Sequence, residues 1–172
     1  MRKLQGQTDI PLNADGRALA VKAHDEYKDV HFDVCFCSPL MRAKETAALL
    51  LEGRNVPIIY DDRLKEMNFG CYEGVENSFS DPDCPINPFF LDPAHYTAPE
   101  TAESMDSLFE RTGAFLAEKV KPLLAEGKDV LIVGHGAMNS SIVCQVRNLP
   151  RSEFWANGLE QCKLMPLPDT WS

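Results

Sequence analysis

The sequence has neither a surplus of basic residues nor a long apolar run. Its 26 Asp and Glu residues outnumber its 17 Lys and Arg residues, so the formal net charge is −9. Without a basic stripe to neutralise the phosphates of a polymer, nucleic acid and anionic membranes are not expected as partners. No apolar run approaches the roughly 20 residues of a membrane helix, and the N-terminus lacks a signal-peptide hydrophobic region. We therefore expect a cytoplasmic protein. A small phosphorylated ligand stays compatible with this charge, because one or two well-placed arginines hold it.

The cysteines form no Cys-x-x-Cys pair and no cluster with histidine at zinc spacing. Cys35 and Cys37 stand two residues apart in a predicted strand, so they should share one face and behave as small buried hydrophobes. We interpret the 6 cysteines as reduced thiols rather than as a disulfide framework. The sequence supports no structural or catalytic metal and no cofactor.

Helical and strand patterns alternate along the chain. With 172 residues, of which 44% are hydrophobic, it has material for a single domain over residues 1–172. The alternation predicts an α/β sandwich whose strands are mostly parallel. Helices are predicted at residues 14–28, 38–52 (with Ser38 as cap and Pro39 in the first position), 100–124 and 137–147; strands are predicted at 32–37, 57–60 and 129–133, with a short edge strand at 160–166.

His135 lies where a buried strand turns into a helix. Residues 130–133 are four consecutive apolar residues between Lys128-Asp129 and a Gly-His-Gly turn, and the helical pattern resumes at Ala137. Open α/β sheets bind ligands at this edge, and free N–H groups of the helix N-terminus would favour an anion. Taken alone, the pattern fits an ordinary turn histidine equally well.

Residues 75–101 combine prolines and aromatic residues. Pro82, Pro85, Pro88, Pro93 and Pro99 rule out one long helix. Aromatic residues are too many for a disordered linker, so we predict a packed insertion that shapes a substrate pocket as a lid.

Four segments, in this order and at about these distances, resemble the histidine phosphatase superfamily, which is phosphoglycerate-mutase-like. The resemblance covers nearly the whole chain and implies a three-layer α/β/α sandwich. The segments are QGQTDIPL at 5–12, SPLMRAKETA at 38–47, LKEMNFGCYEG at 64–74 and VGHG at 133–136.

The resemblance also implies roles for individual residues. Arg42 matches a phosphate-clamping arginine, whose fork would stabilise the charge on the equatorial oxygens. His135 matches a pocket histidine that donates to the same oxygens. Glu66 matches the proton donor to the leaving alkoxide, a role that requires a raised pKa; Glu73 is the less favoured alternative. The phosphate-lining residues matched in this way are Gln5, Gly6 and Gly136.

The sequence departs from the family pattern at its beginning. The first central strand and its Arg-His-Gly motif, which carries the nucleophilic histidine, would precede Met1. His24, His31 and His95 do not follow a buried strand and cannot replace it. A misplaced start or truncation is favoured over a natural fragment. The missing strand would leave unpaired ladder groups, so we expect a weakened or rearranged sheet, closed by a partner chain if the protein forms a homo-oligomer.

Two classes of function follow from the resemblance. The first is a metal-independent phosphomonoesterase with a phosphohistidine intermediate in the complete protein, this chain being inactive as written; a phosphoglycerate mutase is a lesser variant. The second is a catalytically silent phosphate-binding or interaction protein on the same fold. Both imply a small phosphorylated partner, whose identity the sequence leaves open.

Overall fold

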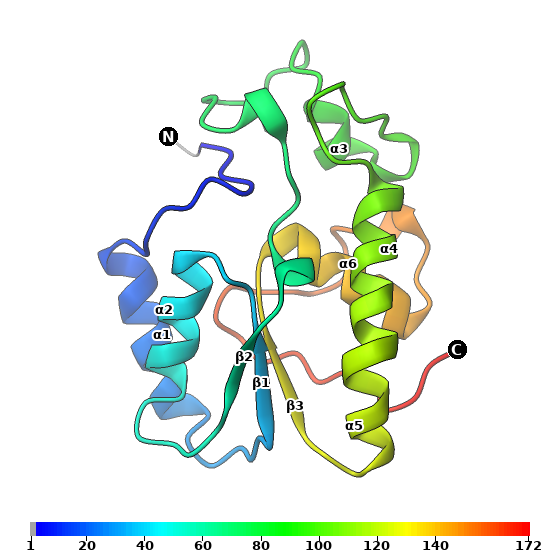
Figure 1. Cartoon of the computed structure of the whole chain (residues 1–172). Coiled ribbons are helices and arrows are strands. Elements are labelled where there is room, and N and C mark those ends of the chain that lie inside the picture. Colours follow the sequence, from blue (N-terminus) through cyan, green and yellow to red (C-terminus); the bar gives the residue numbers. More distant parts are fainter. Residues whose placement is uncertain (1–2) are drawn as a thin grey trace.

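A parallel sheet forms the centre of the molecule. The computed structural model describes residues 3–172, and within them the sheet has three strands in the order β2-β1-β3. Strand β1 (Val34–Cys37) lies between β2 (Ile58–Tyr60) and β3 (Val130–Val133), and both pairings are parallel. The strands all point their carboxyl ends toward the upper part of Figure 1. This arrangement confirms the predicted α/β fold with parallel strands.

Strands β1 and β3 are direct neighbours. They pair over four residues, from Val34 opposite Val130 to Cys37 opposite Val133. The ladder groups of β1 and β3 satisfy each other, so no gap lies between these two strands. Strand β3 pairs on one side only within residues 3–172, and hollows lined by Leu131, Ile132 and Leu164 lie beside it. The ends of these strands, and the residues that follow them, are brought side by side.

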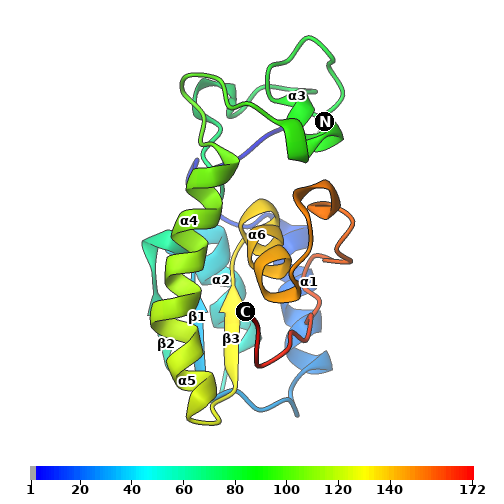
Figure 2. The ribbon, with the colours of Figure 1, turned by 90° about the vertical axis from the view of Figure 1, so that its right-hand side faces the viewer.

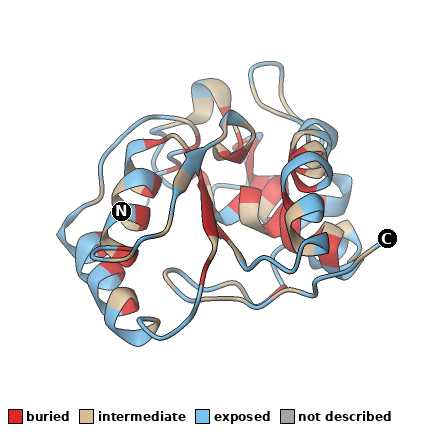
Figure 3. Cartoon of the chain, turned by 60° about the horizontal axis from the view of Figure 1, so that its bottom comes forward, coloured by how far each residue is buried: buried red, intermediate tan, exposed pale blue. Residues whose placement is uncertain are grey.

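Helices cover both faces of the sheet. On one side α1 (Ala14–Glu26) packs against α2 (Met41–Leu50), and on the other α4 (Met105–Phe115) packs against α6 (Gly136–Arg147) (Figures 1 and 2). Side chains of β1 alternate accordingly, so Cys35 and Cys37 share the α1–α2 face, as predicted, while Phe36 faces the α4–α6 core. Figure 3 shows the buried residues on the strands and on the inward sides of the helices.

The start of α2 differs from the sequence prediction. The helix begins at Met41 rather than at Ser38 or Pro39, and no side chain of its own cap residue, Leu40, closes it. The Met41 N–H instead donates to Asp9 Oδ1 at 2.7 Å. A cap oxygen from a distant segment is invisible to local capping rules, which explains the error.

The helix predicted over residues 100–124 starts later and is not uniform. It begins at Met105 with Ser104 as cap, widens into a π-helical turn over Leu116–Val120, and ends as α5 (Lys121–Ala125). Residues before Ser104 do not join the helix, because the Glu103 N–H donates to Asn68 O at 2.7 Å. Pro122 has no N–H to donate back into the helix, which accounts for the irregular turn before it.

The edge strand predicted at residues 160–166 is wrong. These residues form a turn and irregular backbone, with Lys163 N donating to Glu160 O. Cys162 adopts a φ of 54°, in the left-handed region, which interrupts an extended strand at its centre.

The insertion is packed, as its aromatic content predicts. It contains the short helix α3 (Asn87–Leu91) and several single turns, including Pro93–His95. Phe89 is fully buried and joins this segment to the main hydrophobic core. Within the described chain, no helix combines the length and apolarity required to span a lipid bilayer.

Replacement of Phe115 tests the packing between α4 and the sheet. Phe115 is fully buried, and its ring meets that of Phe36 edge-on at 5.3 Å. Phe115→Ala should lower the free energy of unfolding by about 3–5 kcal/mol, through lost burial and the cavity left behind. Urea unfolding followed by circular dichroism measures this. Leu91→Ala is the control, because Leu91 is 74% exposed and should change stability by less than about 0.5 kcal/mol; equal effects would contradict the packing.

Candidate functional site

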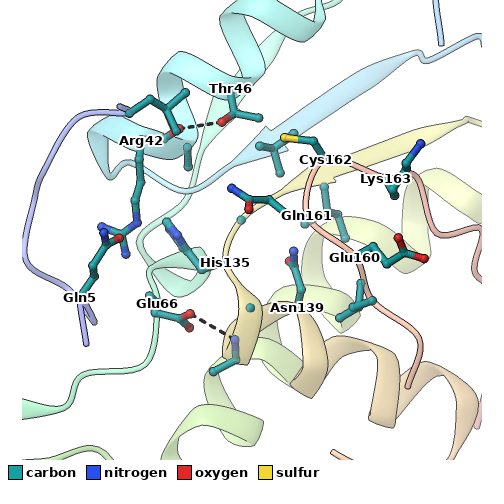
Figure 4. A pocket seen from close by; sticks show the side chains of 18 of the residues that line it. Gln5, Arg42, Thr46, Glu66, His135, Asn139, Glu160, Gln161, Cys162 and Lys163 are labelled. Atoms are coloured by element: carbon teal, nitrogen blue, oxygen red, sulfur yellow. Dashed lines mark hydrogen bonds between the residues drawn. The ribbon is translucent and has the colours of Figure 1, made fainter. Parts of the chain in front are cut away.

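A hollow of about 550 Å³ runs along β3 and past its carboxyl end to the turn before α6. It is lined by residues from the N-terminal loop, α1, α2, the segment after β2, the insertion, β3 with the turn into α6, and segment 155–164. Figure 4 shows Arg42, Gln5, His135 and Glu66 gathered on one side of this hollow, with Asn139 and Gln161 across from them. The structure thus brings together every site residue predicted from the sequence, namely Gln5, Gly6, Arg42, Glu66, His135 and Gly136.

His135 is the N-cap residue of α6 and is only 8% exposed. Burial, followed by the positive charges of Arg42 and Arg111, lowers its pKa from 6.5 to about 3. Its Nε2 lies 2.7 Å from Ser38 Oγ. Because Ser38 Oγ already accepts from Leu40 N, its proton is free to point at Nε2, which favours the neutral tautomer protonated on Nδ1. A neutral donor of this kind suits an anionic oxygen.

Glu66 occupies the N-terminus of α6. Its Oε1 accepts from Met67 N at 2.8 Å and from Met138 N at 3.0 Å, and its Oε2 accepts from Ala137 N at 3.1 Å. The helix N–H groups expected to be free for a ligand are therefore partly taken by this carboxylate. Burial raises the pKa of Glu66, while these three N–H donors and Arg42 act in the opposite direction.

Arg42 holds the N-terminal loop. Its Nη1 donates to Thr8 O at 2.9 Å and its Nη2 to Gly6 O at 2.6 Å. Desolvation lowers the pKa of Arg42, but an arginine stays charged at any ordinary pH. Each Nη carries a second hydrogen, so the guanidinium retains donors for a ligand in the hollow.

Glu73 secures the same loop from the other side. Its Oε1 accepts from Gln7 N at 2.9 Å and Phe69 N at 3.1 Å, and its Oε2 accepts from Thr8 N at 2.9 Å. Gly6 has a φ of 54°, and a Cβ there would lie 2.1 Å from Glu73 Oε1. Glycine is required at this position by both conformation and space. These contacts give Glu73 a structural task that is distinct from proton donation.

Sequence reasoning missed two residues that support the site. The sequence pattern predicts Ser38 as a helix cap, whereas in the structure its hydroxyl contacts His135 Nε2. The available signal is its position directly after a buried strand. Arg111 of α4 donates to Lys65 O at 2.8 Å and to Glu66 O at 3.3 Å, and it pairs with Glu103 at 2.7 Å. Nothing in the spacing of α4 distinguishes Arg111 from a solvated helix residue.

The other histidines of the sequence lie away from the hollow. His24 contacts Glu52 O, and His95 contacts Asp92. His31 stands near Asp33 and Asp129 in an exposed group at the amino ends of the strands. Asp33 there already accepts from Asp129 N at 2.7 Å. The 6 cysteines are all free, and burial raises the pKa of both Cys35 and Cys37 to about 12, which keeps them protonated.

Comparisons with known proteins agree with this geometry. The family model described as "Histidine phosphatase superfamily (branch 1)" matches residues 1–168. The chain is 34% identical to "Uncharacterized phosphatase PhoE" of Bacillus subtilis, over 84% of this chain and 69% of that protein. It is 31% identical to a 2,3-bisphosphoglycerate-dependent phosphoglycerate mutase of Cytophaga hutchinsonii, over 76% of this chain and 63% of that protein. The solved structure of Bacillus stearothermophilus YhfR superposes with a TM-score of 0.79 at 29% identity, covering 90% of this chain and 76% of that one.

Glu73→Gln tests the support of the loop. An amide keeps one acceptor and turns an NH₂ group toward the donors that Glu73 now satisfies, so the free energy of unfolding should fall by about 1–3 kcal/mol. Amide hydrogen exchange should become faster at Gln7 and Thr8. Glu110→Gln, on the exposed side of α4, serves as control. Unchanged exchange at Gln7 and Thr8 in Glu73→Gln would refute the anchoring role.

The pKa of His135 is directly measurable. Its folded-state pKa of about 3 lies below the ordinary 6.5, so the unfolded chain binds a proton there that the folded chain does not. Stability contributed by His135 should therefore be complete above pH 6.5 and decline as the pH falls toward 3. In NMR titration, the His135 ring signal, assigned by its loss in His135→Asn, should not shift around pH 6.5. A midpoint there would contradict burial of a neutral imidazole.

Proposed function

The chain belongs to the histidine phosphatase superfamily, and on this premise we propose that it carries the substrate site of a metal-independent phosphomonoesterase. The observation that supports this most strongly is the convergence of Arg42, His135 and Glu66 on one hollow at the strand ends. A charged fork, a neutral hydrogen-bond donor and a half-buried carboxyl are groups that suit phosphoryl transfer when no metal takes part. The relatives include proteins named as phosphatases.

In the proposed reaction, the phosphate of the substrate lies between Arg42, His135 Nδ1 and the loop at Gln5 and Gly6. A histidine nitrogen attacks phosphorus, the phosphorus–oxygen ester bond breaks, and Glu66 gives its proton to the leaving alkoxide. Water then attacks the phosphohistidine and releases inorganic phosphate, while Glu66 takes up a proton from that water. Burial raises the pKa of Glu66, which is the direction that a proton donor in the first step requires.

The attacking histidine is not supplied by residues 3–172, because His24, His31 and His95 lie outside the hollow. We propose that the complete protein carries it in an Arg-His-Gly segment and that this chain alone does not turn over. We further propose a small phosphorylated substrate and a cytoplasmic location. Oligomeric state is left open, a homo-oligomer included.

One observation favours a second function. Arg42 and His135 form an anion pocket that needs no further histidine in order to bind phosphate, so a catalytically silent phosphate-binding protein on this fold is the alternative. A phosphoglycerate mutase is a weaker variant. Its support is the similarity to the Cytophaga mutase, whereas the insertion is short and no group specific for a bisphosphate stands out.

Hydrolysis of p-nitrophenyl phosphate in the presence of EDTA tests the enzyme proposal. The protein purified from its own cells, with its intact mass determined, should hydrolyse this ester, whereas the 172-residue chain should not. In the active form, Arg42→Ala, Glu66→Gln and His135→Ala should each reduce kcat/KM by about 100-fold or more, as expected for lost transition-state contacts. Arg17→Ala and Glu110→Gln are the matched controls and should leave the rate unchanged. If all five variants kept full activity, the site assignment would be wrong.

Anion binding distinguishes the silent alternative. Orthovanadate at about 100 times its dissociation constant should stabilise the chain by about 2.7 kcal/mol, measured as a rise in Tm that Arg42→Ala abolishes. Binding without hydrolysis in both forms of the protein would favour the silent alternative. Absence of both binding and hydrolysis would refute an anion site.

A further inference from the structure

One wall of the hollow is aromatic. Phe79, Phe90 and Trp155 line it together with Phe69, which lies three residues after Glu66 in the chain. The ring centroids of Phe69 and Phe90 are 6.4 Å apart, and those of Phe90 and Trp155 are 5.7 Å apart with an interplanar angle of 20°. A continuous series of rings therefore lines this part of the hollow. Phe79 and Phe90 come from the insertion at the top of Figure 2, Trp155 from the segment after α6, and Phe69 from the segment after β2.

The aromatic wall is rigid. The Trp155 indole Nε1 donates to Phe89 O at 2.9 Å. The Trp155 ring also meets the buried rings of Phe89 at 5.2 Å and Phe154 at 4.8 Å, both edge-on. Trp155 nevertheless keeps 38% of its surface exposed. A large ring that is fixed from behind and open on the hollow loses little conformational freedom when it binds a flat group.

The charges in the hollow argue against an acidic substrate body. Apart from Arg42, the lysines that line the described part of the hollow are Lys3 and Lys163. Lys3 pairs with Glu76 at 3.4 Å, and Lys163 pairs with Glu26 at 3.0 Å. Apart from Arg42, no lysine or arginine that lines the hollow among residues 3–172 is thus without an acidic partner that would compete with the carboxylate of a phosphorylated acid or with a second phosphate.

We infer that the preferred substrate is a phosphomonoester whose alcohol carries an uncharged aromatic or heteroaromatic ring, which packs against Trp155 and Phe90 while the phosphate lies at Arg42 and His135. This inference rests on the proposed anion site and adds the chemical class of the group attached to it. Burial of a ring against this wall supplies apolar contact and stacking. Lys3 is already paired with Glu76, so an uncharged substrate group leaves no lysine there without a partner.

Stable phosphonates test this without requiring turnover. Their carbon–phosphorus bond is not hydrolysed, so the 172-residue chain is sufficient. The dissociation constants of methylphosphonate, benzylphosphonate and 2-carboxyethylphosphonate are measured by calorimetry. Benzylphosphonate should bind about tenfold or more tightly than methylphosphonate, a factor equivalent to about 1.4 kcal/mol, and the carboxyethyl compound should gain nothing.

Two variants locate the effect on the wall. Trp171→Phe leaves Trp155 as the single tryptophan of the 2 in the sequence, and benzylphosphonate should then quench its fluorescence whereas methylphosphonate should not. Trp155→Leu keeps an apolar side chain without the flat ring, and should make methyl- and benzylphosphonate bind about equally. Leu91→Ala, exposed on the insertion, is the control and should retain the preference.

The outcomes separate this inference from the proposed function. Equal binding of methyl- and benzylphosphonate by the unaltered chain would overturn the aromatic preference and leave the anion site intact. Tighter binding of the carboxyethyl compound would overturn it in favour of an acidic substrate. Failure of all three phosphonates to bind would refute the anion site itself, and with it both proposals.

Discussion

The carboxylate of Glu66 holds the site together. It accepts from Ala137 N and Met138 N in the first turn of α6 and from the adjacent Met67 N, so it ties the segment after β2 to the helix after β3. A negative charge is stabilised at a helix N-terminus, and the N–H groups there need acceptors. Arg111 of α4 donates hydrogen bonds to backbone carbonyls of the same segment. The position of Glu66 beside His135 therefore follows from helix electrostatics as well as from the course of the chain.

The position of His135 and Ser38 depends on the sheet. Parallel pairing of β1 with β3 places the residues that follow these strands at one edge, where Ser38 and His135 form a hydrogen bond across 97 positions of sequence. Burial then keeps the imidazole neutral, since an uncompensated charge there would be costly. Arg42, the second residue of α2, supplies the fixed positive charge that the neutral histidine does not.

Local patterns in the sequence were sufficient for much of the fold. The apolar run before His135 and the helical pattern that begins at residue 14 are encoded in neighbouring residues, and the strand and the helix are both found as predicted. Features that depend on distant residues could not be predicted in this way. Asp9 closes α2 from another segment, and the left-handed backbone at Cys162 breaks what reads as a strand.

The candidate site shows the same division. The segments that resemble the family contain all the residues predicted to surround the phosphate, and these residues all line the hollow. The contact of Arg111 with the site could not be predicted, because its guanidinium binds backbone carbonyls and the helical spacing of residues does not indicate such contacts. The aromatic composition of the insertion predicted packing, but which rings would face the hollow depends on tertiary contacts such as that between Trp155 and Phe89.

The antiparallel bridge between Lys3 and Glu76 makes the N-terminal loop and the insertion mechanically dependent on each other. Gly74 N also donates to Leu4 O at 2.7 Å beside it. A displacement of the insertion at this point pulls on Leu4, and hence on Gly6, whose carbonyl is bound by Arg42. The start of the insertion and the loop beside Arg42 are consequently joined by backbone contacts, so neither can be displaced at this point without breaking them.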